Sequence, residues 1–331
     1  MDTMRALVLE TIGAELVARD LPMPIAGPGQ VLVEIHASGV NPLDTKIRAG
    51  AAAHAQVSVP AVLGIDLAGK VAALGEGVTS FAVGDEVYGM TGGIGDNQGS
   101  LAEYAAVDAG LLARKPKSMS MLEAASLPLA AITAWEGLVD RAAVGAGELV
   151  LVQGGAGGVG HIAIQLARSQ GATVFATGSE RSFPIIREAG ATPIDRATAV
   201  DEYLASATAG EGFDVVFDSV GGATLDDSFR AVRVYTGHVV SILGWGTHAL
   251  APLSFRGATY SGVFSLLPLL TGRGREHHGK ILTSIAQLAD AGSIKPRLAP
   301  TAYTWSSVEA AHADAAAAGG AGKIVVDLKS D

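Results

Sequence analysis

The chain has 331 residues, with 33 acidic side chains against 23 basic ones and no cysteine. At roughly 150 residues per domain, this length predicts two domains or one large one, each able to bury a core. A formal net charge of −10 with dispersed charges argues against binding to nucleic acid or to an anionic membrane. The lack of cysteine excludes a disulfide framework, a thiolate nucleophile and cysteine ligands for zinc or an iron–sulfur cluster.

No stretch of the chain predicts a membrane span. The richest apolar stretch, 262–270, is interrupted by Ser265 and Pro268 and is far shorter than the ~20 residues that a span requires. Residues 1–10 lack the ordered charged, apolar and cleavage regions of a signal peptide. Together these features predict a cytoplasmic protein.

Residues 1–122 are expected to be mostly β. Apolar and polar side chains alternate over 31–36, after a segment rich in proline and glycine, which indicates a half-buried strand. Further short strands are predicted at 71–74, 86–88 and 102–107, where glycines separate the apolar runs.

From residue 123 to residue 264 the pattern predicts alternating strands and helices. Strand-like runs begin near 149, 173, 192, 213, 238 and 258, with helical segments between most of them. Such a rhythm is typical of βαβ units and therefore of a parallel sheet. The continuous apolar run at 215–217 suits a strand that is covered on both faces.

The segment 265–331 shows a mixed pattern. A helix is predicted at 276–291, where Gly292 would end it, and a last strand at 323–328. A chain that leaves a domain and then returns makes that domain discontinuous. We therefore expect 1–122 and 265–331 to form one domain around a separate domain formed by the residues between them.

The most informative segment is 148–167, which reads ELVLVQGGAGGVGHIAIQLA. A strand runs into a glycine loop that opens a helix, and a dinucleotide-binding motif requires this context. The backbone of such a loop approaches the pyrophosphate, and the helix N-terminus supplies N–H donors and a partial positive charge. Glycine also serves plain tight turns, so the spacing GxxGxxG alone would be weak support. The predicted cofactor-binding residues of the loop are Gly154, Gly157, Gly158, Val159 and Gly160.

The end of the second strand of this region bears on which dinucleotide binds. The strand 173–177 closes without an acid, and Ser179, Glu180 and Arg181 follow it. Ser179 and Arg181 suit the 2′-phosphate of NADP, to which arginine can donate two hydrogen bonds. Glu180 would instead bind the ribose hydroxyls of NAD. We predict NADPH; the alternative is that Ser179 and Arg181 merely cap the next helix.

Eight motifs, in a specific order and spacing, extend this pattern over essentially the whole chain. They are GVNPLD at 39–44, LGIDLAG at 63–69, VGDEVYG at 83–89, GSLAEY at 99–104, PLAAITAW at 128–135, the glycine loop, FDSVGG at 217–222 and GKIV at 322–325. In these motifs the chain resembles the medium-chain dehydrogenase/reductase superfamily, and within it the zinc-free NADPH quinone oxidoreductase (zeta-crystallin-like) branch. The resemblance implies an α/β fold with a doubly wound, parallel Rossmann sheet at 123–264 and a β-rich, GroES-like catalytic domain.

Zinc separates the branches of this superfamily. Its zinc-dependent members carry a cysteine where this chain has Asn41, and a His-Glu pair where it has Ile65 and Asp66. Asp66 alone cannot assemble a tetrahedral site, so we expect no metal. His277 and His278 are adjacent, and on a helix they would point about 100° apart and would not chelate one ion. Both are expected to be isolated surface histidines.

Without a metal, the resemblance implies hydride transfer from NADPH to an acceptor that is already electrophilic, a quinone or an α,β-unsaturated carbonyl. Asn41 is the candidate hydrogen-bond donor to the acceptor oxygen, or else only forms a turn with the next proline. Thr133 matches a position that contacts the nicotinamide, although a helical threonine can also bond its own backbone. Lys46 is a candidate to give that oxygen charge or a proton, against a plain solvated lysine. The family often has a tyrosine at position 46 and an aromatic where this chain has alanines at 51–53, which weakens an aromatic clamp.

Four further positions are assigned by the same resemblance. Trp245, after the fourth principal strand, is a candidate wall of the substrate pocket or a cover for the domain edge, and Gly244 beside it is assigned to the cofactor. Relatives often have a tyrosine close to the NADP phosphate where this chain has Asp195 and Arg196. Arg196 is a candidate to take over that contact, the alternative being a surface residue at the start of a helix. Lys323 is expected to reach the cofactor, the alternative being a charge at a strand edge.

Two alternatives to this reductase remain open. A protein of this fold can bind NADPH without catalysis, and the lost aromatics leave room for that reading. An enoyl-thioester reductase would need basic side chains for the phosphates of its carrier, for which Arg273, Arg275 and Lys280 are candidates, although a solvated loop also explains them. The resemblance also implies a homodimer through the edge strand of the Rossmann sheet, at 258–264.

Overall fold

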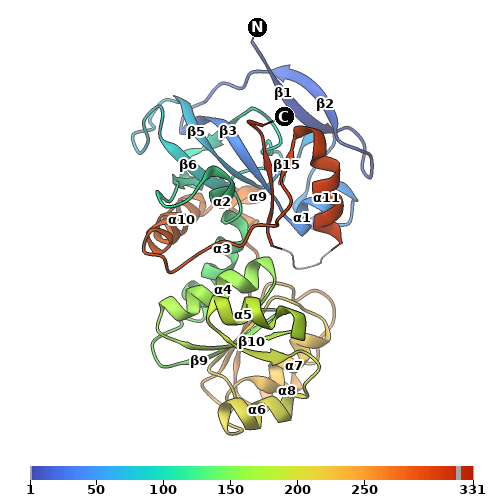
Figure 1. Ribbon diagram of the computed structural model, residues 1–331, viewed down its shortest axis with the longest axis vertical. Helices are drawn as coiled ribbons and strands as arrows, with labels where there is room; N and C mark the ends of the chain where they lie inside the picture. Colours follow the sequence, from blue (N-terminus) through green and yellow to red (C-terminus); the bar gives the residue numbers. More distant parts are fainter. Residues whose placement is uncertain (1, 318–321, 331) are drawn as a thin grey trace. The chain divides into compact units, whose positions relative to one another are not determined.

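The computed structural model describes residues 2–317 and 322–330, which fold into two compact units (Figure 1). One unit consists of Met1–Leu129 and Leu266–Asp331, and the other of Ala130–Ser265. The first unit is therefore discontinuous in sequence, and blue and red segments pack together in it (Figure 1). The boundary follows Leu129 rather than residue 122, because helix α2 (Met121–Ala125) packs on four strands of the first unit.

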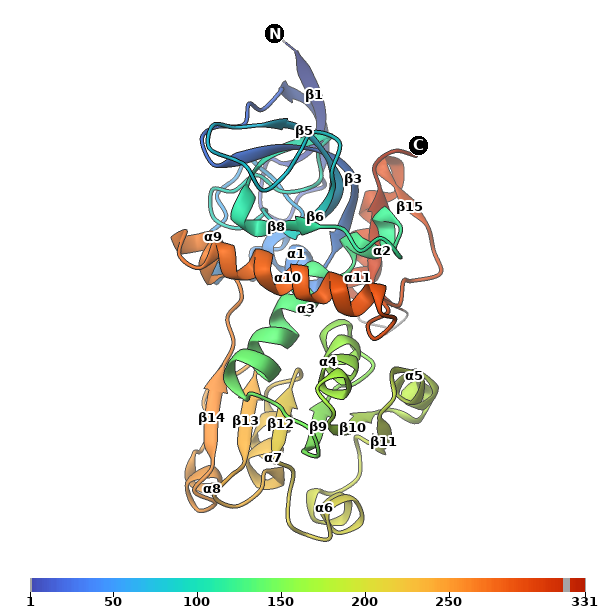
Figure 2. The same cartoon turned by 90° about the vertical axis from the view of Figure 1, so that its left-hand side faces the viewer.

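The second unit is built on a six-stranded parallel sheet. Its strands lie side by side in the order β11-β10-β9-β12-β13-β14 (Figure 2). Their bounds are Leu149–Gln153 (β9), Thr173–Gly178 (β10), Thr192–Asp195 (β11), Val215–Asp218 (β12), His238–Ser241 (β13) and Thr259–Gly262 (β14). Each strand begins close to the position that the hydrophobic pattern predicts.

Helices cover both faces of this sheet. The helix that enters the unit, α3 (Pro128–Trp135), continues into a π-helical segment, η3 (Glu136–Arg141). On the side of η3 lie α4 (Gly158–Ser169) and α5 (Phe183–Ala189), whereas α6 (Val200–Thr208), α7 (Ala223–Ala231) and α8 (Ala251–Ser254) pack together on the other side. The predicted doubly wound Rossmann sheet is confirmed.

The first unit contains two mostly antiparallel sheets. A seven-stranded sheet has the order β15-β16-β3-β5-β6-β8, with β7 paired to β3, and a smaller sheet has the order β2-β1-β4. Their bounds are Thr3–Leu9 (β1), Val17–Pro22 (β2), Gln30–Val40 (β3), Ala61–Val62 (β4), Asp66–Leu74 (β5), Glu86–Met90 (β6), Tyr104–Asp108 (β7), Leu112–Arg114 (β8), Tyr303–Thr304 (β15) and Ile324–Asp327 (β16). The β-rich domain expected from the sequence is thus present.

Five helices accompany these sheets: α1 (Pro42–Arg48), α2, α9 (Leu267–Thr271), α10 (Arg275–Asp290) and α11 (Val308–Ala316), with short 3-10 turns at Ala53–Ala55, Ala109–Leu111 and Trp305–Ser307. Helix α10 packs on β6 and β8, and the hydroxyl of Tyr88 donates to the carbonyl oxygen of Leu282 over 2.6 Å. Helix α1 packs against α11.

One expectation about α10 is wrong. His278 is not a surface residue, because it is 1% exposed on the face of α10 that also buries Ile281, whereas His277 is exposed. Of the basic side chains that a solvated loop would explain, Arg273 lies in an exposed turn, whereas Arg275 and Lys280 lie on α10. Among the described residues, no helix combines the length and apolar character needed to cross a membrane.

Candidate functional site

In the glycine loop between β9 and α4, the backbone packs so closely that several of the glycines have no room for a side chain. Gly154 has a φ of +77°, in the left-handed region that favours glycine. A Cβ on Gly160 would lie 2.3 Å from the carbonyl oxygen of Gly154, and one on Gly155 would lie 2.5 Å from the Cβ of Ala176. Glycine is therefore needed here for close backbone approach as well as for the turn.

The loop delivers the N-terminus of α4 as a site for an anion. Gly157 is the N-cap residue, and Gly158, Val159 and Gly160 form the first turn. The N–H groups of a first turn have no acceptor within their helix, and the helix dipole adds a partial positive charge. This is the arrangement that binds a pyrophosphate group.

Side chains behind the loop fix its first residues. The N–H of Gly154 donates to Thr177 Oγ1 over 3.1 Å, and the N–H of Gly155 donates to the carbonyl oxygen of Thr177 over 2.9 Å. The hydroxyl of Thr177 in turn donates to Gln153 Oε1 over 2.7 Å. These donors are already used, so the donors left for a ligand are those of the first turn of α4.

The predicted phosphate-recognition residues come together at the carboxyl ends of β10 and β11. The N–H of Arg196 donates to the carbonyl oxygen of Gly178 over 2.9 Å, which places Arg196 beside the end of β10. Ser179 follows directly, and Arg181 lies in a 3-10 turn, η4 (Glu180–Ser182). Arg181, Arg196 and Glu180 are all exposed, so that two arginines and one acid surround the same loop.

Residues predicted for the nicotinamide end lie in two places of the second unit. Thr133 is buried on α3, and its hydroxyl is 3.1 Å from that of Ser265, so it does bond a group outside its own helix. Trp245 is 53% exposed and lies edge-on against Phe264, with 6.3 Å between ring centroids. Gly244 lies under the hydroxyl of Tyr260, which a Cβ would approach to 2.3 Å.

In the first unit, Asn41 is the centre of a buried polar cluster, which comprises Asn41, Asp44, Asp66 and Lys323. The Nδ2 of Asn41 donates to Asp66 Oδ2 over 3.0 Å, and its Oδ1 accepts a hydrogen bond from the Lys323 ammonium. The N–H of Asn41 donates to Asp44 Oδ2 over 2.8 Å. The second oxygen of Asp66 accepts from the N–H of Leu129 over 2.9 Å.

Burial sets the acidity of this cluster. The pKa of Asp44 is raised to about 7, chiefly by burial and also by the neighbouring Asp66 carboxylate, while the hydrogen bond from the N–H of Asn41 lowers it. Burial also raises the pKa of Asp66 to about 6, although the Lys323 ammonium and Asn41 lower it. For Lys323, burial lowers the pKa while both carboxylates raise it. The cluster is thus a set of titratable groups with strongly perturbed acidity, which is typical of functional sites.

The sequence did not identify Asp44 or Asp66 as functional residues. Both lie in motifs that carry the resemblance, GVNPLD and LGIDLAG, and Asp66 is an acid within an apolar run, whereas Asp44 is followed by Thr45 and Lys46. An acid in an apolar run is a usable signal, because ionised side chains are rarely buried without a partner. Lys46, by contrast, is exposed on α1 and lies outside the contacts that define the cluster.

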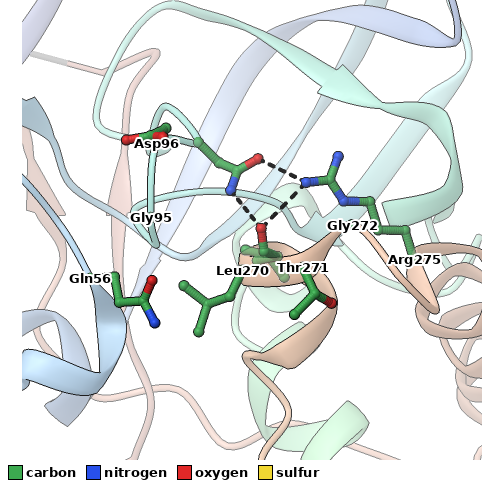
Figure 3. Close-up of a pocket in the computed structure, with 9 residues that line it drawn as sticks. Gln56, Gly95, Asp96, Leu270, Thr271, Gly272 and Arg275 are labelled. Atoms are coloured by element: carbon green, nitrogen blue, oxygen red, sulfur yellow. Dashed lines mark hydrogen bonds between the residues drawn. The ribbon is translucent and has the colours of Figure 1, made fainter.

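A separate pocket of about 510 Å³ in the first unit involves a predicted basic side chain (Figure 3). The guanidinium of Arg275 donates to Asp108 Oδ2 over 3.0 Å, to Asn97 Oδ1 over 3.3 Å and to the carbonyl oxygen of Leu269 over 3.3 Å. Arg275 therefore fixes neighbouring segments and has few donors left for a carrier phosphate.

Comparison with known families agrees with this architecture. Residues 27–117 match the alcohol dehydrogenase GroES-like domain, and residues 189–326 match the zinc-binding dehydrogenase family. The chain is 37% identical over 290 residues to a 2-methylene-furan-3-one reductase of Solanum lycopersicum, covering 85% of this chain and 67% of the relative. It is 36% identical, with the same coverage, to an NADPH-dependent alkenal/one oxidoreductase of Arabidopsis thaliana chloroplasts.

Two solved structures share the fold over almost the full length. An alcohol dehydrogenase superfamily protein from Novosphingobium aromaticivorans has a TM-score of 0.96 and 52% identity, covering 98% of this chain and 100% of that one. The quinone oxidoreductase from Coxiella burnetii has a TM-score of 0.82 and 28% identity, covering 99% of this chain and 100% of that one.

Proposed function

The chain belongs to the medium-chain dehydrogenase/reductase superfamily, and from this membership we propose that it is a zinc-independent oxidoreductase that transfers hydride from NADPH to a quinone or an α,β-unsaturated carbonyl. The observation that carries the proposal is the glycine loop, which presents the first turn of α4 as an anion site. Relatives that are named as an NADPH-dependent alkenal/one oxidoreductase and a quinone oxidoreductase support the acceptor class.

The residues present fit NADPH. Gly160 lets the first turn of α4 pack against the carbonyl oxygen of Gly154, and the N–H groups of that turn are the donors for a pyrophosphate. Arg181 and Arg196 flank the end of β10, where the 2′-phosphate of NADP would follow the ribose. When bound, NADPH supplies a hydride. The residues that we assign to the cofactor are Gly154, Gly157, Gly158, Val159, Gly160, Ser179, Arg181, Arg196 and Gly244, with Thr133 at the nicotinamide.

The cluster around Asn41 does not fit zinc. It offers an amide oxygen and carboxylates but no imidazole or thiolate, and the Lys323 ammonium already binds the Asn41 oxygen. Within residues 2–317 and 322–330, no group of three or more His, Asp or Glu side chains is placed to hold a metal ion. An acceptor that needs no metal to polarise it, such as a quinone or an enone, suits this donor set.

We assign stabilisation of the acceptor oxygen to the cluster of Asn41, Asp66 and Lys323. Hydride addition to an enone leaves negative charge on oxygen, and a preorganised cation or hydrogen-bond donor lowers the barrier to that step. Trp245, half-exposed beside Phe264, is the proposed wall for the flat acceptor. The role of Lys46 stays a prediction.

We also propose that two copies associate through β14. This strand is the last in the order of its sheet, and Thr259, Tyr260 and Gly262 are exposed. An edge strand presents backbone N–H and C=O groups that a second copy can satisfy. The cytoplasmic location stays a prediction from the sequence.

The test of the proposed function is NADPH oxidation by protein treated with a chelator, with 1,4-benzoquinone, 9,10-phenanthrenequinone and a small enone as acceptors. We expect turnover that survives chelation and prefers NADPH to NADH. Loss of turnover that zinc restores would contradict the metal-free reaction. NADPH binding without reduction of any acceptor would instead favour a thioester substrate or a non-enzymatic role.

A further inference from the structure

The buried cluster has one member that a ligand can reach. Asn41, Asp44 and Asp66 are 3%, 1% and 0% exposed, so neither a substrate nor a cofactor can contact them without rearrangement. Lys323, which precedes β16, keeps part of its surface exposed. A ligand that makes use of this cluster therefore contacts Lys323.

Asp66 and Asn41 fix the direction of the ammonium. Asp66 accepts from Leu129 N–H with one oxygen and from Asn41 Nδ2 with the other, so its carboxylate cannot turn without losing a bond. The amide of Asn41 must then present its carbonyl oxygen to Lys323. The reverse orientation would set an NH2 group against an ammonium and a carbonyl against a carboxylate. Both ends of the Asn41 side chain are thus occupied within the cluster.

The charges of the cluster keep a cation at this position. Lys323 lies near Asp66 and Asp44, and the charge of Asp66, joined by that of Asp44 once Asp44 ionises, offsets the cost of burying an ammonium. An ammonium has three N–H donors, and the bond to Asn41 uses one of them. Among the described residues, the other two N–H groups have no hydrogen-bond acceptor, and burial increases the acidity of this ammonium.

We propose that Lys323 is the catalytic cation of this protein, whose ammonium binds the carbonyl oxygen of the acceptor and gives it a proton, and that Asn41 and Asp66 are positioning residues for it. This inference rests on the proposed function and replaces Asn41 and Lys46 as the groups that touch the acceptor oxygen. It also assigns Lys323 to the acceptor rather than to the cofactor.

The proton and electron balance is that of a two-electron reduction. The β-carbon of an enone receives a hydride, with its two electrons, from NADPH. The π pair of the C=C bond shifts to join the α-carbon to the carbonyl carbon, and the π pair of the C=O bond moves to oxygen. One N–H bond of Lys323 breaks as the O–H bond of an enol forms, and the enol converts to the ketone. The neutral amine then takes a proton from water.

The decisive comparison is between Lys323→Met and Lys117→Met, a change of an exposed lysine in the same unit. NADPH affinity is measured by fluorescence titration, and kcat and KM are measured with an enone. For Lys323→Met we expect kcat to fall by about 100-fold, the usual effect of losing one preorganised donor, with NADPH affinity changed by less than about twofold. Lys117→Met should behave as wild type.

A result of the opposite kind would overturn the proposal. If Lys323→Met weakens NADPH binding more than about tenfold and leaves kcat unchanged, Lys323 holds the cofactor and not the acceptor. Two controls show whether the variant is folded. NADPH titration reports on the second unit, which contains the glycine loop, and a melting curve reports on the first unit, which contains Lys323.

A second variant tests the positioning role. Asp66 raises the pKa of Lys323, so Asp66→Asn should move the alkaline limb of the kcat profile to lower pH, because the donor loses its proton sooner. In protein labelled with 13C at lysine Cε and studied without any ligand, the Lys323 signal should titrate below the other lysines and lower still in Asp66→Asn. A Lys323 signal that titrates with the other lysines would overturn the proposal for Lys323, whether or not the protein reduces an acceptor. A wild-type protein without turnover would contradict only the proposed function.

Discussion

Replacement of Asp44 by Asn should make the stability of the first unit much less dependent on pH. Asp44 is the third residue of α1 and is 1% exposed. Its Oδ2 accepts from the N–H of Asn41, whereas its Oδ1 is buried without a hydrogen-bond partner among the described residues. Asparagine keeps the shape of the side chain and an oxygen for the Asn41 N–H, but it does not titrate.

The magnitude follows from the pKa of the buried carboxyl. Burial raises the pKa of Asp44 from 3.8 to about 7, so the folded protein holds a proton that the unfolded chain releases above pH ~4. The stability that this proton confers is complete below pH ~4 and is lost as the pH rises through about 7. The loss amounts to about 4 kcal/mol, because a tenfold change in acidity is worth about 1.4 kcal/mol.

The assay is urea unfolding at pH values between 4.5 and 8, with the first unit followed through Trp305 after Trp135 and Trp245 are replaced by Phe. Asp44→Asn should gain on its parent as the pH rises, and Asp20→Asn, a change at an exposed carboxyl, should show no such trend. The Asp66 carboxyl is present in both proteins, so its own titration largely cancels. A stability difference that stays constant over this range would refute the argument that burial keeps Asp44 protonated.

Three further outcomes are expected. Gly160→Ala should weaken NADPH binding at least about tenfold by fluorescence titration, because its Cβ would lie 2.3 Å from a carbonyl oxygen, while Gly145→Ala, with nothing within 4 Å, should not. Arg181→Ala and Arg196→Ala should each raise the KM for NADPH about tenfold and leave that for NADH unchanged; equal effects on both would exclude a role at the 2′-phosphate. Burial lowers the pKa of His312 to about 4, so wild type should lose about 3 kcal/mol relative to His312→Gln as the pH falls from 6.5 to 4, and unfolding curves that stay parallel would contradict this.

The elements of the second unit could be predicted from the sequence because their signals are local. Each element can be recognised from a stretch of about twenty residues or fewer, as with the apolar run at 215–217 and the strand, loop and helix at 148–167. Their pairing in a parallel sheet follows from the alternation of strands and helices. The same reasoning located α10 but did not predict the burial of His278. A histidine occurs on both buried and exposed helix faces, so its presence does not show which face of the helix packs against the sheet.

The cluster around Asn41 could not be predicted in the same way. Asn41 and Asp66 are 25 residues apart and Asn41 and Lys323 are 282 residues apart, so no periodicity connects them. The resemblance supplied Asn41 and Lys323 separately, one for the acceptor and one for the cofactor. Only the register of β16 against β3, which sets Ile324 opposite Val40, brings the two side chains together.

That register has a consequence for the order in which a nascent chain can fold. All six strands of the second unit pair within Ala130–Ser265, so its sheet can close while later residues are still being synthesised. The large sheet of the first unit cannot close at that stage, because β16 is synthesised almost three hundred residues after its partner β3. Until then residues 37–40 of β3 lack the partner that β16 provides, although residues 30–34 can already pair with β7. This part of β3 is therefore an open edge and a site for mispairing with another chain. The middle of the polypeptide is therefore expected to fold first, and Lys323 to join its partners last.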